Sequence, residues 1–388
     1  MKYTKTKGNT QSSRLWFVDN LRVLLTILVI AHHAGQPYGP TGGMWLIFNP
    51  ERADILGVFF ATNAAFFMGL FFLISGYFVP SAYERKGAKL FLQDRFLRLG
   101  IPIVFFALLV FPPVFYFAQS SELSFIQFFF RVYLGQGQIQ VGHLWFLVHL
   151  LFYGICYVLW RKITKKTITL KPEQQKIAVP KHSLILTYLV ALAIVTFITR
   201  IQYPVDTWKS LLWIIPAEIA HLPQYLSLFV IGIIAYYHDW FRRMPTQRGL
   251  IWLGISLGAV LLRYGYALTA NHLFLNRLIA GGSWNWRYAG LLLSSTWEAT
   301  ICVGLCIGLL VLFREQVNRQ GKCWQILSAN AYTVYIIHIL VIIPIQFLFA
   351  PLSIAPLLKF LVITFVGIPL CFLISHYIRK LPFARVVL

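Results

Sequence analysis

Ten apolar stretches recur along this chain of 388 residues, and a helix of about 20 apolar residues crosses the ~30 Å hydrocarbon core of a bilayer. Hydrophobic residues make up 58% of the chain and charged residues 12%, which is about half the charged fraction of a typical soluble domain. We therefore predict an all-α, polytopic membrane protein, because a span must satisfy its backbone hydrogen bonds internally. The ten expected spans cover roughly residues 15–36, 54–80, 99–118, 143–161, 183–200, 220–240, 249–269, 289–313, 324–349 and 356–378.

The basic residues are distributed unevenly between the two sides of this arrangement. The net charge is +22, and with a cytoplasmic N-terminus 25 of the 34 Lys and Arg residues fall in inside segments and 8 in outside segments. This is the positive-inside bias, and it predicts that both termini are cytoplasmic. The charge then serves topology and contact with anionic lipid, and no groove or stacking platform for nucleic acid is recognisable.

The chain shows no sign of a separate soluble domain, so we expect residues 1–388 to form one transmembrane domain in the inner or plasma membrane. The first apolar stretch lacks a convincing cleavage site and is expected to stay as a helix. Five cysteines without a C-x-x-C motif favour neither a disulfide nor a metal site. The outer segment 118–142 is expected to hold a short interfacial helix near 122–134.

The first span carries four polar side chains on one face. Asp19, Arg22, Thr26 and His33 share a stripe because eleven residues separate Arg22 from His33, and eleven steps of a helix return within about 20° of the same face. Ionisable groups at membrane depth usually mark a pathway or a reacting centre. The structural alternative is an Arg22–Asp19 ion pair at the helix start, with His33 at headgroup level.

Five sequence segments resemble, in order and placement, the acyltransferase 3 family of integral-membrane acyltransferases. Arg22, ten intervening residues and His33 match the signature of its first helix. The other segments are FFLISGYFVP at 71–80, DRFLRLGIPI at 94–103, HLWFL at 143–147 and SANAYTVYIIHILV at 328–341. The resemblance implies transfer of an acyl group, usually acetyl, from cytoplasmic acyl-CoA to a hydroxyl of a cell-surface glycan or related acceptor. Some members of the family carry an extracytoplasmic hydrolase-like domain, and we expect none here.

The resemblance and residue chemistry together assign roles to the polar residues. His33, near the outer end of its helix, is the candidate general base or acyl relay. Arg22, nearer the cytoplasm, is the candidate contact for the donor phosphate or thioester. Arg95 and Arg98 stand three residues apart at the cytoplasmic surface and are candidates for binding acyl-CoA phosphates, although the positive-inside rule alone would place cations there.

Four further residues complete the candidate set. Glu298 lies within an apolar span and is a catalytic candidate that would orient a histidine or hydrogen-bond an acceptor. The alternative is a pair with an outer-loop arginine such as Arg287. His338 is a second catalytic candidate, with a structural histidine as the alternative. His143 and Trp145, together with Asp19, form the expected acceptor-binding set.

We expect no metal and no permanently bound cofactor. The expected partners are acyl-CoA, a glycan or lipid-linked saccharide, and membrane lipids. A secondary transporter or polysaccharide exporter remains the alternative function, because it too would place charges in broken helices.

Overall fold

The computed structural model describes residues 14–40, 45–119, 122–164, 177–212, 215–269 and 284–388, apart from the side chains of 284–286 and 385. The expected N-terminal tail and much of the basic loop 161–182 lie outside these ranges. Nearly all of the described chain is helical, which confirms the predicted all-α class. The short elements are α5 (Phe125–Gln127), η3 (Phe128–Leu134), α9 (Trp240–Arg243), α15 (Ala384–Val387) and an antiparallel hairpin of β1 (Trp208–Leu211) and β2 (Ile215–Glu218).

Within the described ranges, nine helical runs are long and apolar enough to cross a membrane. Several of these runs combine consecutive helices. They are α1 (Trp16–Gly35); α2 (Leu56–Arg95) continued by η1 (Phe96–Gly100), α3 (Ile101–Phe105), η2 (Phe106–Val110) and α4 (Phe111–Ala118); η4 (Gly142–Leu144) with α6 (Trp145–Thr164); α7 (His182–Gln202); η6 (Ile219–His221) with α8 (Leu222–His238); α10 (Thr246–Leu268); α12 (Trp284–Gln316); α13 (Lys322–Phe349); and α14 (Pro356–Ile378).

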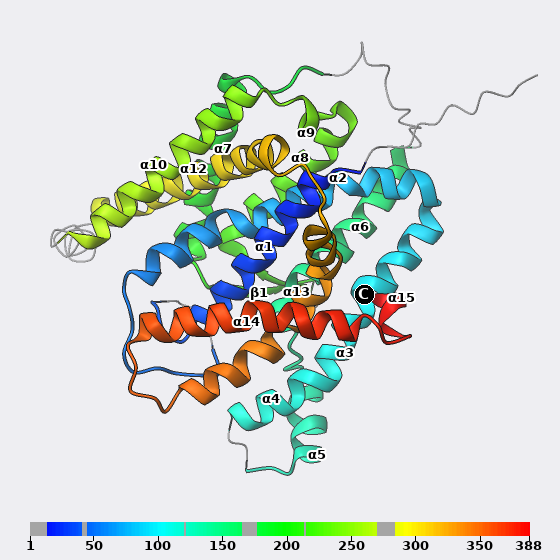
Figure 1. Ribbon diagram of the computed structural model, residues 1–388, viewed down its shortest axis with the longest axis vertical. Helices are drawn as coiled ribbons and strands as arrows, with labels where there is room; N and C mark the ends of the chain where they lie inside the picture. Colours follow the sequence, from blue (N-terminus) through cyan, green and yellow to red (C-terminus); the bar gives the residue numbers. More distant parts are fainter. Residues whose placement is uncertain (1–13, 41–44, 120–121, 165–176, 213–214, 270–283) are drawn as a thin grey trace, which may run out of the picture.

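The second run explains why nine runs correspond to ten expected spans. It contains 63 residues, and a straight helix of that length would extend ~95 Å, about three bilayer cores. Gly87 breaks the run with φ 70° and ψ 170°, a conformation that glycine adopts without the steric penalty of a Cβ. The chain turns there, so the expected spans 54–80 and 99–118 lie on opposite sides of the break (Figure 1).

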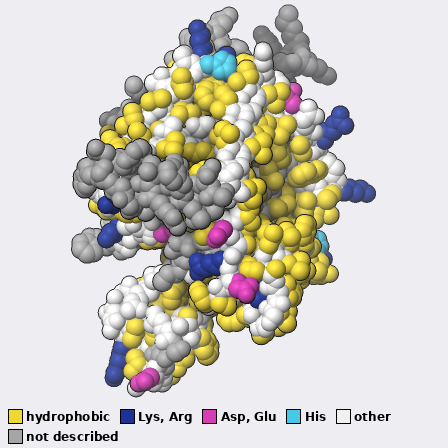
Figure 2. Space-filling model, turned by 90° about the vertical axis from the view of Figure 1, so that its left-hand side faces the viewer, with side chains coloured by type: hydrophobic (Ala, Val, Ile, Leu, Met, Phe, Trp, Pro, Cys, Tyr) yellow, Lys and Arg dark blue, Asp and Glu magenta, His cyan; other side chains and the backbone are white. Residues whose placement is uncertain are grey.

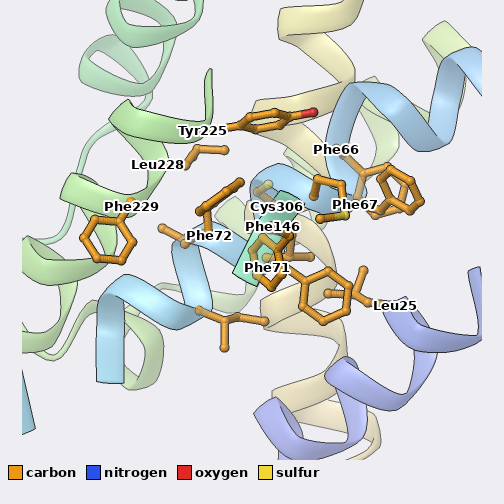
Figure 3. Close-up of a cluster of buried hydrophobic side chains, with 14 of the residues drawn as sticks. Leu25, Phe66, Phe67, Phe71, Phe72, Phe146, Tyr225, Leu228, Phe229 and Cys306 are labelled. Carbon is orange, nitrogen blue, oxygen red and sulfur yellow. The ribbon is translucent and has the colours of Figure 1, made fainter. Parts of the chain in front are cut away.

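The centre of the bundle is built around the packing of α2 against α8. A Cβ added at Gly76 would lie 2.1 Å from the carbonyl oxygen of Phe229, and one at Gly232 would lie 2.2 Å from that of Leu73. Small residues of this kind allow helix backbones to approach closely in a membrane. Figure 3 shows the aromatic layer beside this contact, with Phe72 lying between the helices that carry Tyr225 and Leu25.

A second packing layer joins α1, α13 and α14. Val23 and Ile30 of α1 are fully buried in one apolar cluster with Val334 and Ile342 of α13. Since α1 and α13 both run from the end of the molecule that holds Arg22 toward the end that holds His33, their polar faces can meet along their length.

The outer surface of the bundle is largely apolar. Leu261 of α10 is 69% exposed and Phe365 of α14 is 72% exposed, as suits side chains in contact with lipid. The blue loop that follows α1, residues 36–40 and 45–55, lies at one end of the molecule, on the left of Figure 1. Figure 2 views that end and shows a few charged side chains scattered over a mainly hydrophobic surface.

Candidate active site

A large cavity lies in the bundle, and its lining includes Gln36, Asp54, Val205 and Glu218 from the irregular segments after α1 and α7. Its volume is about 2320 Å³, and on α1 its lining reaches as deep as Val29. Three of the predicted site residues, His33, His143 and Trp145, line this cavity. The structure therefore brings together three predicted side chains from distant parts of the sequence, with His33 on α1 and the other two at the start of the third run.

His33 and His338 form the centre of the site. Nε2 of His338 lies 3.0 Å from Nδ1 of His33, and the ring centroids are 4.8 Å apart. Nδ1 of His338 lies 2.7 Å from the carbonyl oxygen of Tyr335. A carbonyl oxygen only accepts, so His338 carries its proton on Nδ1 and, when neutral, presents Nε2 as an acceptor.

This arrangement fixes the tautomer of His33. Its Nδ1 faces two acceptors, Nε2 of His338 at 3.0 Å and the carbonyl oxygen of Val29 at 2.9 Å. Nδ1 therefore carries the proton and donates, which leaves Nε2 with its lone pair free. Nε2 forms no hydrogen bond within the described part of the chain. The geometry is that of a general base whose orientation is set by a neighbour.

His143 lies on the other side of His338. Its ring centroid is 4.9 Å from that of His338, and its Nε2 lies 2.9 Å from the carbonyl oxygen of Ile336. Nε2 therefore donates, and the buried Nδ1 has no hydrogen-bond partner among the described residues. Tyr335 holds η4 in place by donating its hydroxyl hydrogen to the carbonyl oxygen of His143. His143 therefore presents an unused acceptor inside the site.

Two residues that the sequence interpretation missed hold His33 from the outer side. Trp45 stacks on the His33 ring, with centroids 5.5 Å apart and planes 23° from parallel. Its indole Nε1 donates to Oε1 of Gln346 at 2.9 Å, while Nε2 of Gln346 donates to the carbonyl oxygen of His33 at 2.8 Å. The fully buried Gln346 thus ties the segment 36–55 to the end of α1.

The predicted donor residues form a second group, about three helical turns from His33 toward the other end of α1. Arg22, Arg95 and Arg98 all interact electrostatically with the phenol of Tyr332, whose hydroxyl donates to the carbonyl oxygen of Arg98. Asp94 lies 3.4 Å from Nε of Arg98. Across the described ranges neither Arg22 nor Arg95 forms a salt bridge, so the group has excess positive charge. It can attract phosphate oxygens.

Asp19 lies apart from the other expected acceptor-binding residues. Its carboxylate accepts a hydrogen bond of 2.7 Å from Nε of Arg14, at the start of α1. It does not line the cavity. The structural alternative for Arg22, an ion pair with Asp19, is also not what the structure forms.

Glu298 does not pair with His33, with His338 or with Arg287. It forms an ion pair of 2.7 Å with Arg200 of α7 and contacts Nε2 of His221 at 2.9 Å. Nδ1 of His221 in turn lies 2.9 Å from Glu218 at the end of β2. This network stands behind the cavity wall that the hairpin provides, so Glu298 supports that wall rather than the histidine pair.

A pattern in α13 could have revealed part of this site. Tyr332, Tyr335 and His338 recur every three residues and follow one face of the helix, parallel to the stripe of α1. Trp45 and Gln346 gave no such signal, because one lies in an irregular segment and the other is a lone amide in an apolar helix. Among the described side chains no group of three or more His, Cys, Asp or Glu residues is arranged to hold a metal ion.

The fold and this site define a multi-pass membrane protein with a histidine centre inside its bundle. A family profile described as an acyltransferase domain matches residues 15–376, nearly the whole chain. The protein therefore belongs to the acyltransferase 3 family, as the sequence motifs indicated.

The chain is also similar to individual curated proteins. Glucans biosynthesis protein C of Salmonella heidelberg (strain SL476) is 27% identical over 272 residues, which cover 68% of this chain and 68% of that protein. The protein of the same name from Salmonella typhi is 27% identical over the same length and coverage. No solved structure matches the chain significantly.

Proposed function

We propose that this protein transfers an acyl group, acetyl in the first instance, from cytoplasmic acyl-CoA to a hydroxyl of an extracytoplasmic glycan. The observation that carries the proposal is that His33 lines the cavity, with Nδ1 held by His338 and Val29 and with no hydrogen-bond partner for Nε2 among the described residues. Glucans biosynthesis protein C, a similar protein by name concerned with glucans, supports a glycan acceptor.

The chemistry follows from the tautomer of His33. Nε2 removes the proton of the acceptor hydroxyl as its oxygen attacks the thioester carbonyl, and the imidazolium then returns that proton to the departing thiolate. The products are an ester and free coenzyme A. Acylation of Nε2 followed by attack of the hydroxyl is the other order of events. In both orders His338 stabilises the Nδ1 proton on His33.

The cluster of Arg22, Arg95 and Arg98 supports binding of the donor at the opposite end of the bundle. Coenzyme A carries several phosphate groups, and arginine side chains pair with phosphate in a bidentate manner. The positive-inside distribution supports a cytoplasmic location for this end and hence an inner or plasma membrane protein. The thioester must then reach His33, ~16 Å along α1 from Arg22.

The test uses full-length protein in lipid nanodiscs with radiolabelled acetyl-CoA and a neutral gluco-oligosaccharide. We expect labelled oligosaccharide from the wild type and from the control variant His376→Ala, whose histidine is exposed on α14, and none from His33→Ala at equal folded protein. Normal acylation by His33→Ala would overturn the role of His33. Passage of oligosaccharide across liposomes without acylation would instead support a transporter.

A further inference from the structure

The segment between α7 and α8 forms one wall of the cavity, remote in sequence from the histidine pair. Asp206, Trp208 and Glu218 of this segment all line the cavity, as does Trp145 at the start of α6. Trp208 is 44% exposed, so its indole surface is open to a ligand. A tryptophan of the interfacial belt would face lipid, whereas this one contributes to the cavity lining.

The aromatic rings of this wall form a continuous surface. The rings of Trp145 and Trp208 meet nearly at right angles, with centroids 5.7 Å apart. Trp145 stacks on Tyr225 at 5.3 Å, and Tyr225 stacks on His221 at 5.9 Å. Each ring therefore packs against the next, and Trp208 is the last and most exposed ring of the four.

Asp206 places a free carboxylate next to this surface. Its backbone has φ 65°, a left-handed conformation that Asp tolerates better than most residues. The conformation is held by a hydrogen bond of 2.9 Å from its backbone N–H to Oε1 of Glu218. The side-chain oxygens of Asp206 accept no hydrogen bond from the described residues. Burial, together with the neighbouring charge of Glu218, raises the pKa of Asp206.

The ion network behind the wall fixes Glu218. Burial raises the pKa of Glu218, but the adjacent His221 outweighs burial and lowers that pKa below its usual value. Glu218 is therefore ionised at neutral pH. Since His221 is held between Glu218 and Glu298, each at 2.9 Å, the carboxylates are rigidly placed before any ligand arrives. A rigid site loses less conformational entropy when it binds.

We propose that Trp208, Trp145, Asp206 and Glu218 form a subsite for a neutral saccharide. Sugar rings stack their C–H faces on indole surfaces, and their hydroxyl groups donate to carboxylate oxygens. This combination of an open indole with two carboxylates suits a hydroxyl-rich ring and does not suit an anionic ligand. The inference rests on the proposed function, because it assigns the acceptor glycan to this wall of the cavity that also contains His33.

The experiment separates saccharide binding from acyl transfer. Binding of a neutral gluco-oligosaccharide to the full-length protein in nanodiscs is measured by saturation-transfer NMR, in the wild type and in His33→Ala. We expect binding in both, and about a tenfold loss of affinity in Trp208→Ala and in Asp206→Asn, because the first variant removes the stacking surface and the second removes a charged hydrogen-bond acceptor. The matched control is Trp160→Ala, an indole 43% exposed at the other end of α6.

The possible results show separately whether the saccharide subsite is wrong and whether the proposed acyl transfer is wrong. Unchanged binding in both Trp208→Ala and Asp206→Asn would overturn the subsite, even if the protein acylates glycans. Binding that is lost in these variants would support the subsite even if no acyl transfer were detected. In an active protein the same variants are expected to raise the KM for the acceptor about tenfold, while the KM for acetyl-CoA stays constant.

Discussion

Nε2 of His338 accepts a hydrogen bond of 3.0 Å from Nδ1 of His33, and the two residues are 305 positions apart in sequence. The carbonyl oxygen of Tyr335 fixes the proton of His338 on Nδ1, and this in turn fixes which nitrogen of His33 is basic. A backbone group of α13 thus controls the protonation of a side chain on α1. Removal of His338 should affect catalysis without affecting either binding step.

The variant His338→Leu tests this relationship. Without His338, the carbonyl oxygen of Val29 is the one acceptor left for Nδ1 of His33 among the described residues. The tautomer with its proton on Nε2, which has no lone pair there to act as a base, is then less disfavoured. We expect kcat to fall about 10- to 100-fold, less than the roughly 10²- to 10⁴-fold that proton transfer by a positioned group contributes, because His338 orients the base and is not the base itself. Both KM values should remain unchanged. His338→Gln keeps a hydrogen-bond acceptor and should retain more activity. Equal kcat in His338→Leu and the wild type would contradict the assignment.

Trp45 is expected to stabilise the charged form of His33 during the reaction. Its indole face lies 5.5 Å from the His33 ring, and an aromatic face is worth roughly 0.5–2 kcal/mol to a cation. Trp45→Leu should therefore lower kcat about 2- to 30-fold, measured by steady-state acetyl transfer, with little change in the KM for acetyl-CoA. Trp45→Phe retains an aromatic face and should lose less. A larger defect in the Phe variant than in the Leu variant would exclude this role.

The arginine group predicts a graded effect on donor binding. Arg95 has no carboxylate partner in the described chain, whereas Arg98 is 3.4 Å from Asp94. Arg95→Gln should therefore weaken acetyl-CoA binding more than Arg98→Gln, by about tenfold for the loss of one charged hydrogen bond. Isothermal titration at two salt concentrations measures this, and the wild type should show the steeper salt dependence. Equal affinity of wild type and Arg95→Gln would remove Arg95 from the donor site.

The acidic pair of the cavity wall predicts opposite effects of two substitutions on stability. The lowered pKa of Glu218 stabilises the fold above the unfolded pKa of about 4.3, and this contribution is lost as the pH falls. Glu218→Gln should therefore lower Tm at pH 7 and flatten its acid dependence. The raised pKa of Asp206 means that its ionised carboxylate destabilises the fold at neutral pH. Asp206→Asn should therefore keep or raise Tm at pH 7 although it weakens saccharide binding. Thermal unfolding in detergent at pH 4 to 8 measures both effects.

Much of the architecture could be predicted from the sequence because the bilayer imposes a length and a composition on each span. The apolar spans and the polar face of α1 depend on local patterns. The meeting of His33, His143 and His338 depends instead on how their helices pack. The partners of Glu298 could not be predicted. Arg200 and Arg287 both lie near the outer ends of spans, and only the packing of α7 against α12 decides between them.

The same limit applies to the turn at Gly87 and to Trp45. Nothing in the residues 81–94 shows that one glycine, rather than the Pro80 that precedes it, interrupts the helical geometry. Trp45 reaches His33 only because Gln346, 301 residues away, holds its indole nitrogen. Contacts of this kind depend on three-dimensional packing and leave no periodic signal.

The close contact of α2 with α8 gives a final prediction that concerns the scaffold alone. A methyl group at Gly76 would lie 2.1 Å from a backbone oxygen of α8, and a backbone atom cannot move aside as a side chain can. Gly76→Ala should separate the two helices and destabilise the protein by about 1–3 kcal/mol, the usual cost of overpacking. Gly254→Ala is the matched control, because a Cβ at that position in α10 meets nothing within 4 Å and alanine favours the helix. Thermal unfolding in the same detergent should therefore give a lower Tm for Gly76→Ala and an unchanged or higher Tm for Gly254→Ala. Equal Tm values for the two variants would mean that the α2–α8 contact is looser than the structure shows.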